Sequence, residues 1–288
     1  MGVLVLAACG REEAAEGGLR VVATTTIVGA LVEEVAGEGV AVDVLLPVGA
    51  DPHDYQPSAS EIASLHAADL VVANGLGLEE ALLEALAAAQ ADGVRVLELG
   101  SQIEPLPMNG TEQPDPHFWF DPLRLGTAAR ALAAELARVD DSGDWEARAA
   151  AFASDLEAAD REIRDILSVI PTDDRHLITN HDAFTYFAAR YELEIVGSVF
   201  PGSDELADPS SSHLADLVRL VTLFDTMAIF SEAGQSSEMA EAVAAETGRP
   251  IEVVALYSDS LGEPGSGADT LIGMLLTDAR LIADALSR

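Results

Sequence analysis

Residues 144–170, DWEARAAAFASDLEAADREIRDILSVI, form the stretch that decides the fold of this chain. Its apolar side chains recur at steps of four and three residues, namely at Trp145, Ala149, Phe152, Leu156, Ala159, Ile163, Ile166 and Ile170. This spacing is typical of a helix that buries one continuous stripe. At 1.5 Å per residue, a helix of about 26 residues extends roughly 40 Å, which is long enough to run from one lobe to another.

The residues just before this stretch predict a second helix over 122–138, followed by the break Asp140-Asp141-Ser142-Gly143. A helical connector resists hinge bending more than two or three crossing loops do. We therefore predict two lobes, at 19–143 and 171–288, joined by a rigid linking helix at 144–170.

On either side of this helix, short β-branched runs alternate with amphipathic segments. Before it, strands are predicted at 19–24, 40–46, 69–74 and 95–99, and helices at 27–38, 60–67 and 78–91. After it, strands are predicted at 176–179, 193–200, 227–231 and 251–256, and helices at 183–191, 211–224, 238–247 and 270–286. This alternation predicts an α/β fold in which each lobe has a parallel sheet flanked by helices.

The N-terminus differs in character from the rest of the chain. Cys9 follows a short apolar stretch in Leu6-Ala7-Ala8-Cys9-Gly10, which resembles a bacterial lipobox, and the chain then becomes polar. A complete signal peptide has a basic segment and a longer apolar core, and both are missing here. We interpret residues 1–18 as a truncated lipoprotein signal and tether with Cys9 as the lipidation site; an accidental apolar terminus is the alternative.

Composition excludes one class of partner. The formal net charge is -35 at pH 7, and every basic residue is an arginine. Nothing in such a chain could neutralise a phosphate backbone, so we expect no nucleic-acid partner.

Polar residues that suit a metal ion follow the predicted strands. His53, His117 and His181 lie in turn-rich segments, and Asp259 follows the strand predicted at 251–256. In open α/β sheets, ligands bind beyond the carboxyl ends of the strands. Two facing lobes would then bring these four side chains together in the interlobe cleft, as three imidazoles and one carboxylate. From the residues alone, unrelated histidines remain the alternative.

A metal-bound imidazole needs an acceptor on its second nitrogen. Asp54, Asp121 and Asp182 are near the three histidines in sequence, and Glu232 ends a predicted strand on the same rim. We therefore take these four carboxylates as candidate partners of the ligands. His66, His176 and His213 are expected to have structural or solvent roles.

Four ordered motifs carry a family resemblance over almost the whole chain. They are LPVGADPHDYQPS at 46–58, DPHFWFDP at 115–122, TNHDAFTYF at 179–187 and LYSDSLG at 256–262. In these motifs the chain resembles the metal-specific (zinc/manganese) solute-binding lipoproteins of ABC transporters. The resemblance implies that His53, His117, His181 and Asp259 are the metal ligands, and that the two lobes are joined by a long helix.

The resemblance also bears on the choice of metal. Family members that bind manganese often carry glutamate at the third ligand position, where this chain has His181. Nitrogen-rich shells suit zinc. Zn²⁺ is therefore the expected ion, with Mn²⁺ or Fe²⁺ as alternatives. The chain departs from some zinc-binding members because residues 104–116 contain no histidine, and it has Asp278 where the family often has asparagine.

The function implied is capture of a divalent metal outside the cytoplasm and its delivery to an ABC permease. We expect a monomer that is lipid-anchored to the outer face of the membrane, or periplasmic, and no enzymatic activity. A metallohydrolase is disfavoured because it needs an open coordination position, whereas four protein ligands close the shell. A metal-dependent adhesin remains an alternative.

Overall fold

The computed structural model describes residues 18–108, 111–201 and 209–287. The proposed lipidation site, Cys9, and residues 1–17 of the proposed tether lie outside the described residues. Among the described helices, none combines the length and the apolar character needed to cross a bilayer.

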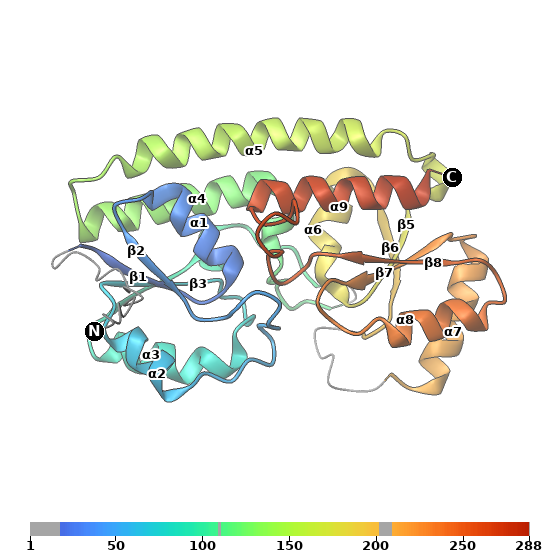
Figure 1. The fold of residues 1–288 in the computed structure, drawn as a ribbon, viewed down its shortest axis with the longest axis horizontal. Helices are drawn as coiled ribbons and strands as arrows, with labels where there is room; N and C mark the ends of the chain where they lie inside the picture. The colour runs from blue at the N-terminus through green and yellow to red at the C-terminus, as the bar shows by residue number, and fades with distance from the viewer. Residues whose placement is uncertain (1–17, 109–110, 202–208, 288) are drawn as a thin grey trace, which may run out of the picture.

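The N-terminal lobe is built on one parallel sheet (Figure 1). Its strands pair in the order β2-β1-β3-β4. They are β1 (Arg20–Ala23), β2 (Ala41–Val44), β3 (Leu70–Ala73) and β4 (Arg95–Glu98). The helices of this lobe are α1 (Thr26–Ala36), α2 (Ala59–His66) and α3 (Leu83–Ala91), with short 3-10 turns η1 (Glu80–Leu82) and η2 (Leu99–Gln102).

Both faces of this sheet are buried, because successive side chains of a strand point in opposite directions. In β1, Val21 and Ala23 pack into the core that α1 covers, whereas Val22 packs on the opposite face with Leu65 of α2 and Leu86 of α3. The continuous apolar runs of β1 and β3 follow from this double burial.

Two antiparallel helices follow the sheet. After the 3-10 turn η3 (Phe118–Phe120), α4 spans Pro122–Val139 and α5 spans Trp145–Leu167. Figure 1 shows α5 running along one side of the whole molecule, with α4 beside one end and α9 (Leu271–Leu286) beside the other. The helix is 23 residues long and ends at Leu167, slightly earlier than predicted, and Val169 is exposed.

The C-terminal lobe repeats the alternation of strands and helices with parallel pairing. Its described ladders form two pairs, β5 with β6 and β7 with β8, and β5 lies in contact with β7. The strands are β5 (His176–Thr179), β6 (Glu194–Ser198), β7 (Ala228–Glu232) and β8 (Glu252–Leu256). The helices, besides α9, are α6 (Thr185–Tyr191), α7 (Ser211–Leu223) and α8 (Glu238–Glu246), with 3-10 turns η4 (Thr172–Asp174) and η5 (Asp182–Phe184).

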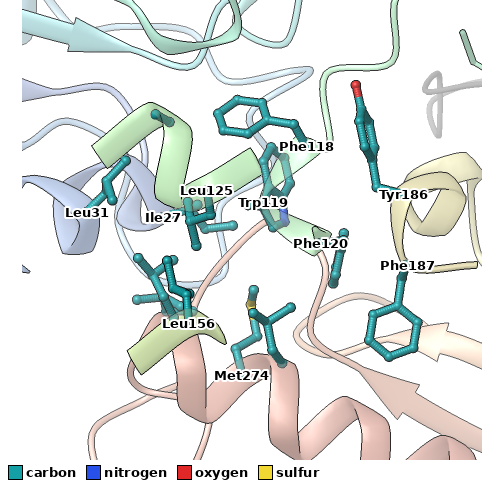
Figure 2. Packing of buried hydrophobic residues seen from close by; sticks show 14 of the residues in the cluster. Ile27, Leu31, Phe118, Trp119, Phe120, Leu125, Leu156, Tyr186, Phe187 and Met274 are labelled. Atoms are coloured by element: carbon teal, nitrogen blue, oxygen red, sulfur yellow. The ribbon is translucent and has the colours of Figure 1, made fainter. Parts of the chain in front are cut away.

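One apolar core continues through both lobes. Leu156 of α5 belongs to the same buried cluster as Ile27 of α1, Leu125 of α4 and Met274 of α9. Figure 2 shows these side chains packed together, with Trp119 and Phe120 on the side that faces Phe187 of the C-terminal lobe. The predicted α/β fold with parallel sheets flanked by helices is therefore confirmed. The boundaries at 143 and 170 remain a proposal, because the core crosses both of them.

Candidate metal centre

The structure brings His53, His117, His181 and Asp259 together between the lobes. His53 lies in the loop from β2 to α2, and His117 directly precedes η3. His181 comes two residues after β5, and Asp259 three residues after β8. Each lobe thus contributes two side chains from loops, and the C-terminal pair comes directly from the carboxyl ends of parallel strands, where ligands of such sheets bind.

The geometry of the four side chains is that of a small coordination shell. One possible ligand atom from each lies within 4.8 Å of the other three. Nε2 of His117 is 3.4 Å from Nε2 of His53, and Nε2 of His181 is 3.1 Å from Oδ2 of Asp259. Ligand atoms placed about 2 Å from a tetrahedral zinc ion are roughly 3.3 Å apart. The observed spacing therefore fits such an ion.

The four side chains are shielded from solvent. The exposed fractions are 10% for His53, 1% for His117, 2% for His181 and 3% for Asp259. Oδ1 of Asp259 is buried and accepts no hydrogen bond from the described residues. A buried carboxylate needs a compensating positive charge. The site is therefore better satisfied with a bound cation than without one.

The two histidines of the N-terminal lobe share a local hydrogen-bonding arrangement. In both Asp-Pro-His sequences, the aspartate accepts a hydrogen bond from the backbone of the histidine. The backbone N–H of His53 donates to Oδ1 of Asp51, and that of His117 donates to Oδ1 of Asp115, each at 2.8 Å. Oδ1 of Asp115 is also 2.8 Å from Nδ1 of the His117 ring. An ionised carboxylate can only accept, so Nδ1 of His117 carries the hydrogen and Nε2 offers its lone pair to the site.

His181 is oriented by a residue distant in sequence. Its Nδ1 lies 3.4 Å from Oε2 of Glu232, which ends the neighbouring strand β7 and is buried. The contact again directs Nε2 toward Asp259. The structure thus places Glu232 where the sequence analysis expected a partner of the ligands.

Asp259 is held in its ionised form. Burial raises the pKa of this carboxyl, but His181, and then His117 and His53, outweigh burial and hold its pKa well below the usual range. The carboxyl of Asp259 therefore favours the anionic form that a metal ligand requires.

One candidate partner is corrected by the structure. Asp121 does not hold a histidine; its carboxylate caps the N-terminus of α4 and pairs with Arg124 and Arg190. A carboxylate placed just before a helix start prefers the free N–H groups of that helix. Its expected role on His117 belongs to Asp115, which the sequence analysis quoted in the motif but did not single out. Asp54 lies beside His53, and Asp182 is buried at the start of η5.

Trp119 forms a wall of the site. Its ring lies edge-on to the ring of His117, with centroids 5.2 Å apart, and its side chain is buried. The remaining histidines lie elsewhere: His66 pairs with Asp92, His176 with Glu194, and the ring of His213 contacts the Ser198 carbonyl.

Two α/β lobes that share a long helix and enclose one buried cluster of three imidazoles and a carboxylate define a two-lobed metal-binding receptor. Comparison with known proteins agrees with this class. The family described as zinc-uptake complex component A, periplasmic, matches residues 21–285. The chain belongs to this family.

Among individual relatives, some names contain manganese and others contain zinc. The manganese-binding lipoprotein MntA of Halalkalibacterium halodurans is 30% identical over 99% of this chain and 95% of its own length. The structure of the periplasmic zinc-binding protein TroA from Treponema pallidum superposes with a TM-score of 0.87 at 28% identity, covering 94% of this chain and all of TroA. The crystal structure of ZnuA superposes with a TM-score of 0.81 at 32% identity, covering 94% of this chain and 100% of that one.

Proposed function

We propose that this chain is the solute-binding receptor of an ABC transporter for a divalent transition metal, with His53, His117, His181 and Asp259 as the ligands. The observation that supports this function most directly is the convergence of one ligand atom from each of these side chains within 4.8 Å, at the junction of the lobes. Four protein ligands fill a tetrahedral shell, which favours binding and delivery over catalysis on a metal-bound water.

Zinc is the ion that the ligand set favours. Three imidazole nitrogens and one carboxylate form a nitrogen-rich shell, and such shells suit zinc better than manganese. Manganese or iron remains the alternative, and the name of the MntA relative supports manganese. Because zinc binds almost any such site more tightly than manganese does, affinity measured in vitro does not by itself identify the physiological ion.

The receptor is proposed to act outside the cytoplasm, tethered by a lipid on Cys9, and to pass its ion to a membrane permease. The description of the family as periplasmic and the word lipoprotein in the name of MntA support this location. We expect a monomer in solution.

Capture requires neutral imidazoles, because a protonated ring has no lone pair for the ion. Ordinary histidines have a pKa of about 6.5, so metal affinity should fall as the pH drops below that value. Lowering the pH below about 6.5 should therefore release the ion.

The direct experiment is calorimetric titration of Zn²⁺ into the wild-type protein and into single and double alanine variants of His53, His117, His181 and Asp259. We expect one tight site in the wild type and a loss of tight binding in the double variants. His66→Ala is the matched control, because His66 lies at the end of α2 and pairs with Asp92. Tight stoichiometric binding by His53→Ala/His117→Ala would refute the assignment.

The physiological ion requires a second measurement. Elemental analysis of the protein purified from its native host, without added metal, should show one equivalent of zinc. One equivalent of manganese or iron would still support the receptor function, but it would identify that metal as the physiological ion instead of zinc.

A further inference from the structure

The segment that carries Asp259 is bonded to the opposite lobe on both sides of that residue. Before it, the Ser258 carbonyl accepts a hydrogen bond from Nε1 of Trp119 at 3.0 Å. After it, the Ser260 hydroxyl accepts the backbone N–H of Gly49 at 2.8 Å. Trp119 and Gly49 both belong to the N-terminal lobe, so the Asp259 segment is held across the junction by protein contacts alone.

A third residue of the N-terminal lobe, Thr26, also bonds to this segment. Oγ1 of Thr26, at the start of α1, accepts the backbone N–H of Leu261 at 3.0 Å and lies 3.3 Å from Oγ of Ser260. The Ser260 hydroxyl is also 3.0 Å from the Leu261 carbonyl, to which it can donate. One assignment of the hydroxyl hydrogens satisfies all these contacts: Thr26 donates to Ser260, and Ser260 donates to Leu261.

The Gly49 N–H is presented by a tight turn. The Ala50 N–H bonds to the Pro47 carbonyl at 3.1 Å, and Gly49 has a φ of 79°. A positive φ at the third position of a turn is readily adopted by glycine and orients the following backbone. The same loop carries His53, so the Ser260 hydroxyl joins the loop of one ligand to the segment of another.

We propose that Ser260, together with Thr26, is a positioning residue for metal retention: its hydroxyl holds the Asp259 carboxylate against the histidines of the opposite lobe and thereby slows release of the ion. This inference rests on the proposed metal-receptor function. Ser260 touches no ligand atom in the contacts described above; it acts on the ion through the backbone on either side of the junction. Its effect should therefore appear in the dissociation rate more than in the stoichiometry.

The experiment measures the rate at which a chromogenic chelator in excess removes Zn²⁺ from the full chain in a stopped-flow instrument. Removal of the Ser260 hydroxyl in Ser260→Ala should raise the dissociation rate about tenfold, because interface hydrogen bonds act mainly on dissociation. Thr26→Val, which keeps the shape but loses the hydroxyl, should act in the same direction. Thr26→Ser, which keeps the hydroxyl, should dissociate at a rate close to that of the wild type.

Ser266→Ala is the control in the same loop, because the Ser266 hydroxyl bonds to the N–H of Ala268 within that loop. It should leave the rate within about twofold of the wild type. Circular dichroism and thermal unfolding of each apo variant separate a local effect from loss of the fold.

The outcomes distinguish the two proposals. A wild type without a tight metal site contradicts the receptor function itself. A wild type with a tight site, and a folded Ser260→Ala variant with an unchanged dissociation rate, overturns only the role of Ser260. Equal acceleration by Ser266→Ala, or by Thr26→Ser and Thr26→Val alike, overturns it as well.

Discussion

The two lobes supply equal numbers of candidate ligands but orient them in different ways. In the N-terminal lobe, Asp115 sits two residues before His117 and bonds to both its backbone and its ring. In the C-terminal lobe, the carboxylate beside His181 is Glu232, which lies 51 positions further along the chain on another strand. The contacts that orient His117 are therefore local in sequence, whereas the contact that orients His181 depends on the packing of β5 against β7.

The difference extends to the buried carboxyls that carry no metal role. Glu79, in the N-terminal lobe, accepts hydrogen bonds from the Thr24 hydroxyl and from two backbone N–H groups, at Asn74 and Gly75. Asp278, on α9, accepts one from the Tyr257 N–H, and its Oδ2 is buried without a partner among the described residues. Both carboxyl oxygens of Glu79 thus accept hydrogen bonds, whereas one carboxyl oxygen of Asp278 has no partner among the described residues.

The largest expected effect tests whether both lobes hold the ion. His181→Ala/Asp259→Ala removes both C-terminal ligands and should abolish stoichiometric Zn²⁺ binding in calorimetry, because two remaining imidazoles cannot complete a shell. His176→Ala/Asp225→Ala is a matched control, since these residues of the same lobe pair elsewhere, with Glu194 and Arg249. Unchanged affinity of the ligand variant would mean that the N-terminal lobe binds alone.

The next effect compares the two orienting carboxylates. Removing an outer partner of a metal-bound histidine typically costs about 10–100-fold in affinity. We expect Asp115→Ala to lie at the upper end, because it loses the bond to the ring and the bond to the backbone of His117. Glu232→Ala should lie at the lower end, with its contact at 3.4 Å. Competition titration with a chelator of known affinity ranks the two, and a larger loss for Glu232→Ala would reverse the comparison.

The smallest effects, on a buried carboxyl of each lobe, concern stability without metal. Burial raises the pKa of Asp278, so the folded state binds more protons than the unfolded state, and the wild type loses stability as the pH rises above about 4. Asp278→Asn keeps the bond to Tyr257 and has no proton to take up on folding, so it should raise the free energy of unfolding by about 1 kcal/mol at pH 7. The gain should shrink toward pH 4 in denaturant titrations.

Glu79→Gln is the counterpart in the other lobe. Burial raises the pKa of Glu79 as well, although the Thr24, Asn74 and Gly75 donors oppose that rise. An amide would turn its NH₂ group toward a backbone donor, so we expect this variant to lose about 1–2 kcal/mol in the same titrations. A gain equal to that of Asp278→Asn would show that burial alone, and not the number of donors, decides the outcome.

The same distinction explains how much the sequence predicted. Every predicted strand and helix has a counterpart in the structure within a few residues, because periodicity, caps and glycine stops are local signals. The capping box from Ser58 to Glu61 and the positive φ of Gly248 are examples. The convergence of His53, His117, His181 and Asp259 could be expected from their places after strands and from ordered family motifs.

Relations between distant segments could not be predicted in the same way. Asp121 and Asp115 are both close to His117 in sequence. Because α4 starts directly after Asp121, that carboxylate caps the helix, while the carboxylate of Asp115 bonds to the ring of His117. The bond from Trp119 to the Ser258 carbonyl joins residues 139 positions apart and leaves no pattern in either segment. The division of the C-terminal strands into two ladders, with a register shift between Leu177 and Ile178, also has no local signal.

The helix α5 has a consequence for how the molecule melts. It contributes Trp145, Phe152 and Leu156 to a core that also contains Ile27 of one lobe and Met274 of the other. Neither lobe can lose its structure without exposing apolar surface of the shared helix, so the two should unfold cooperatively. We expect a single calorimetric transition whose van't Hoff and calorimetric enthalpies agree, in a chain long enough for two independent transitions. The helix that packs along both lobes would then couple their unfolding.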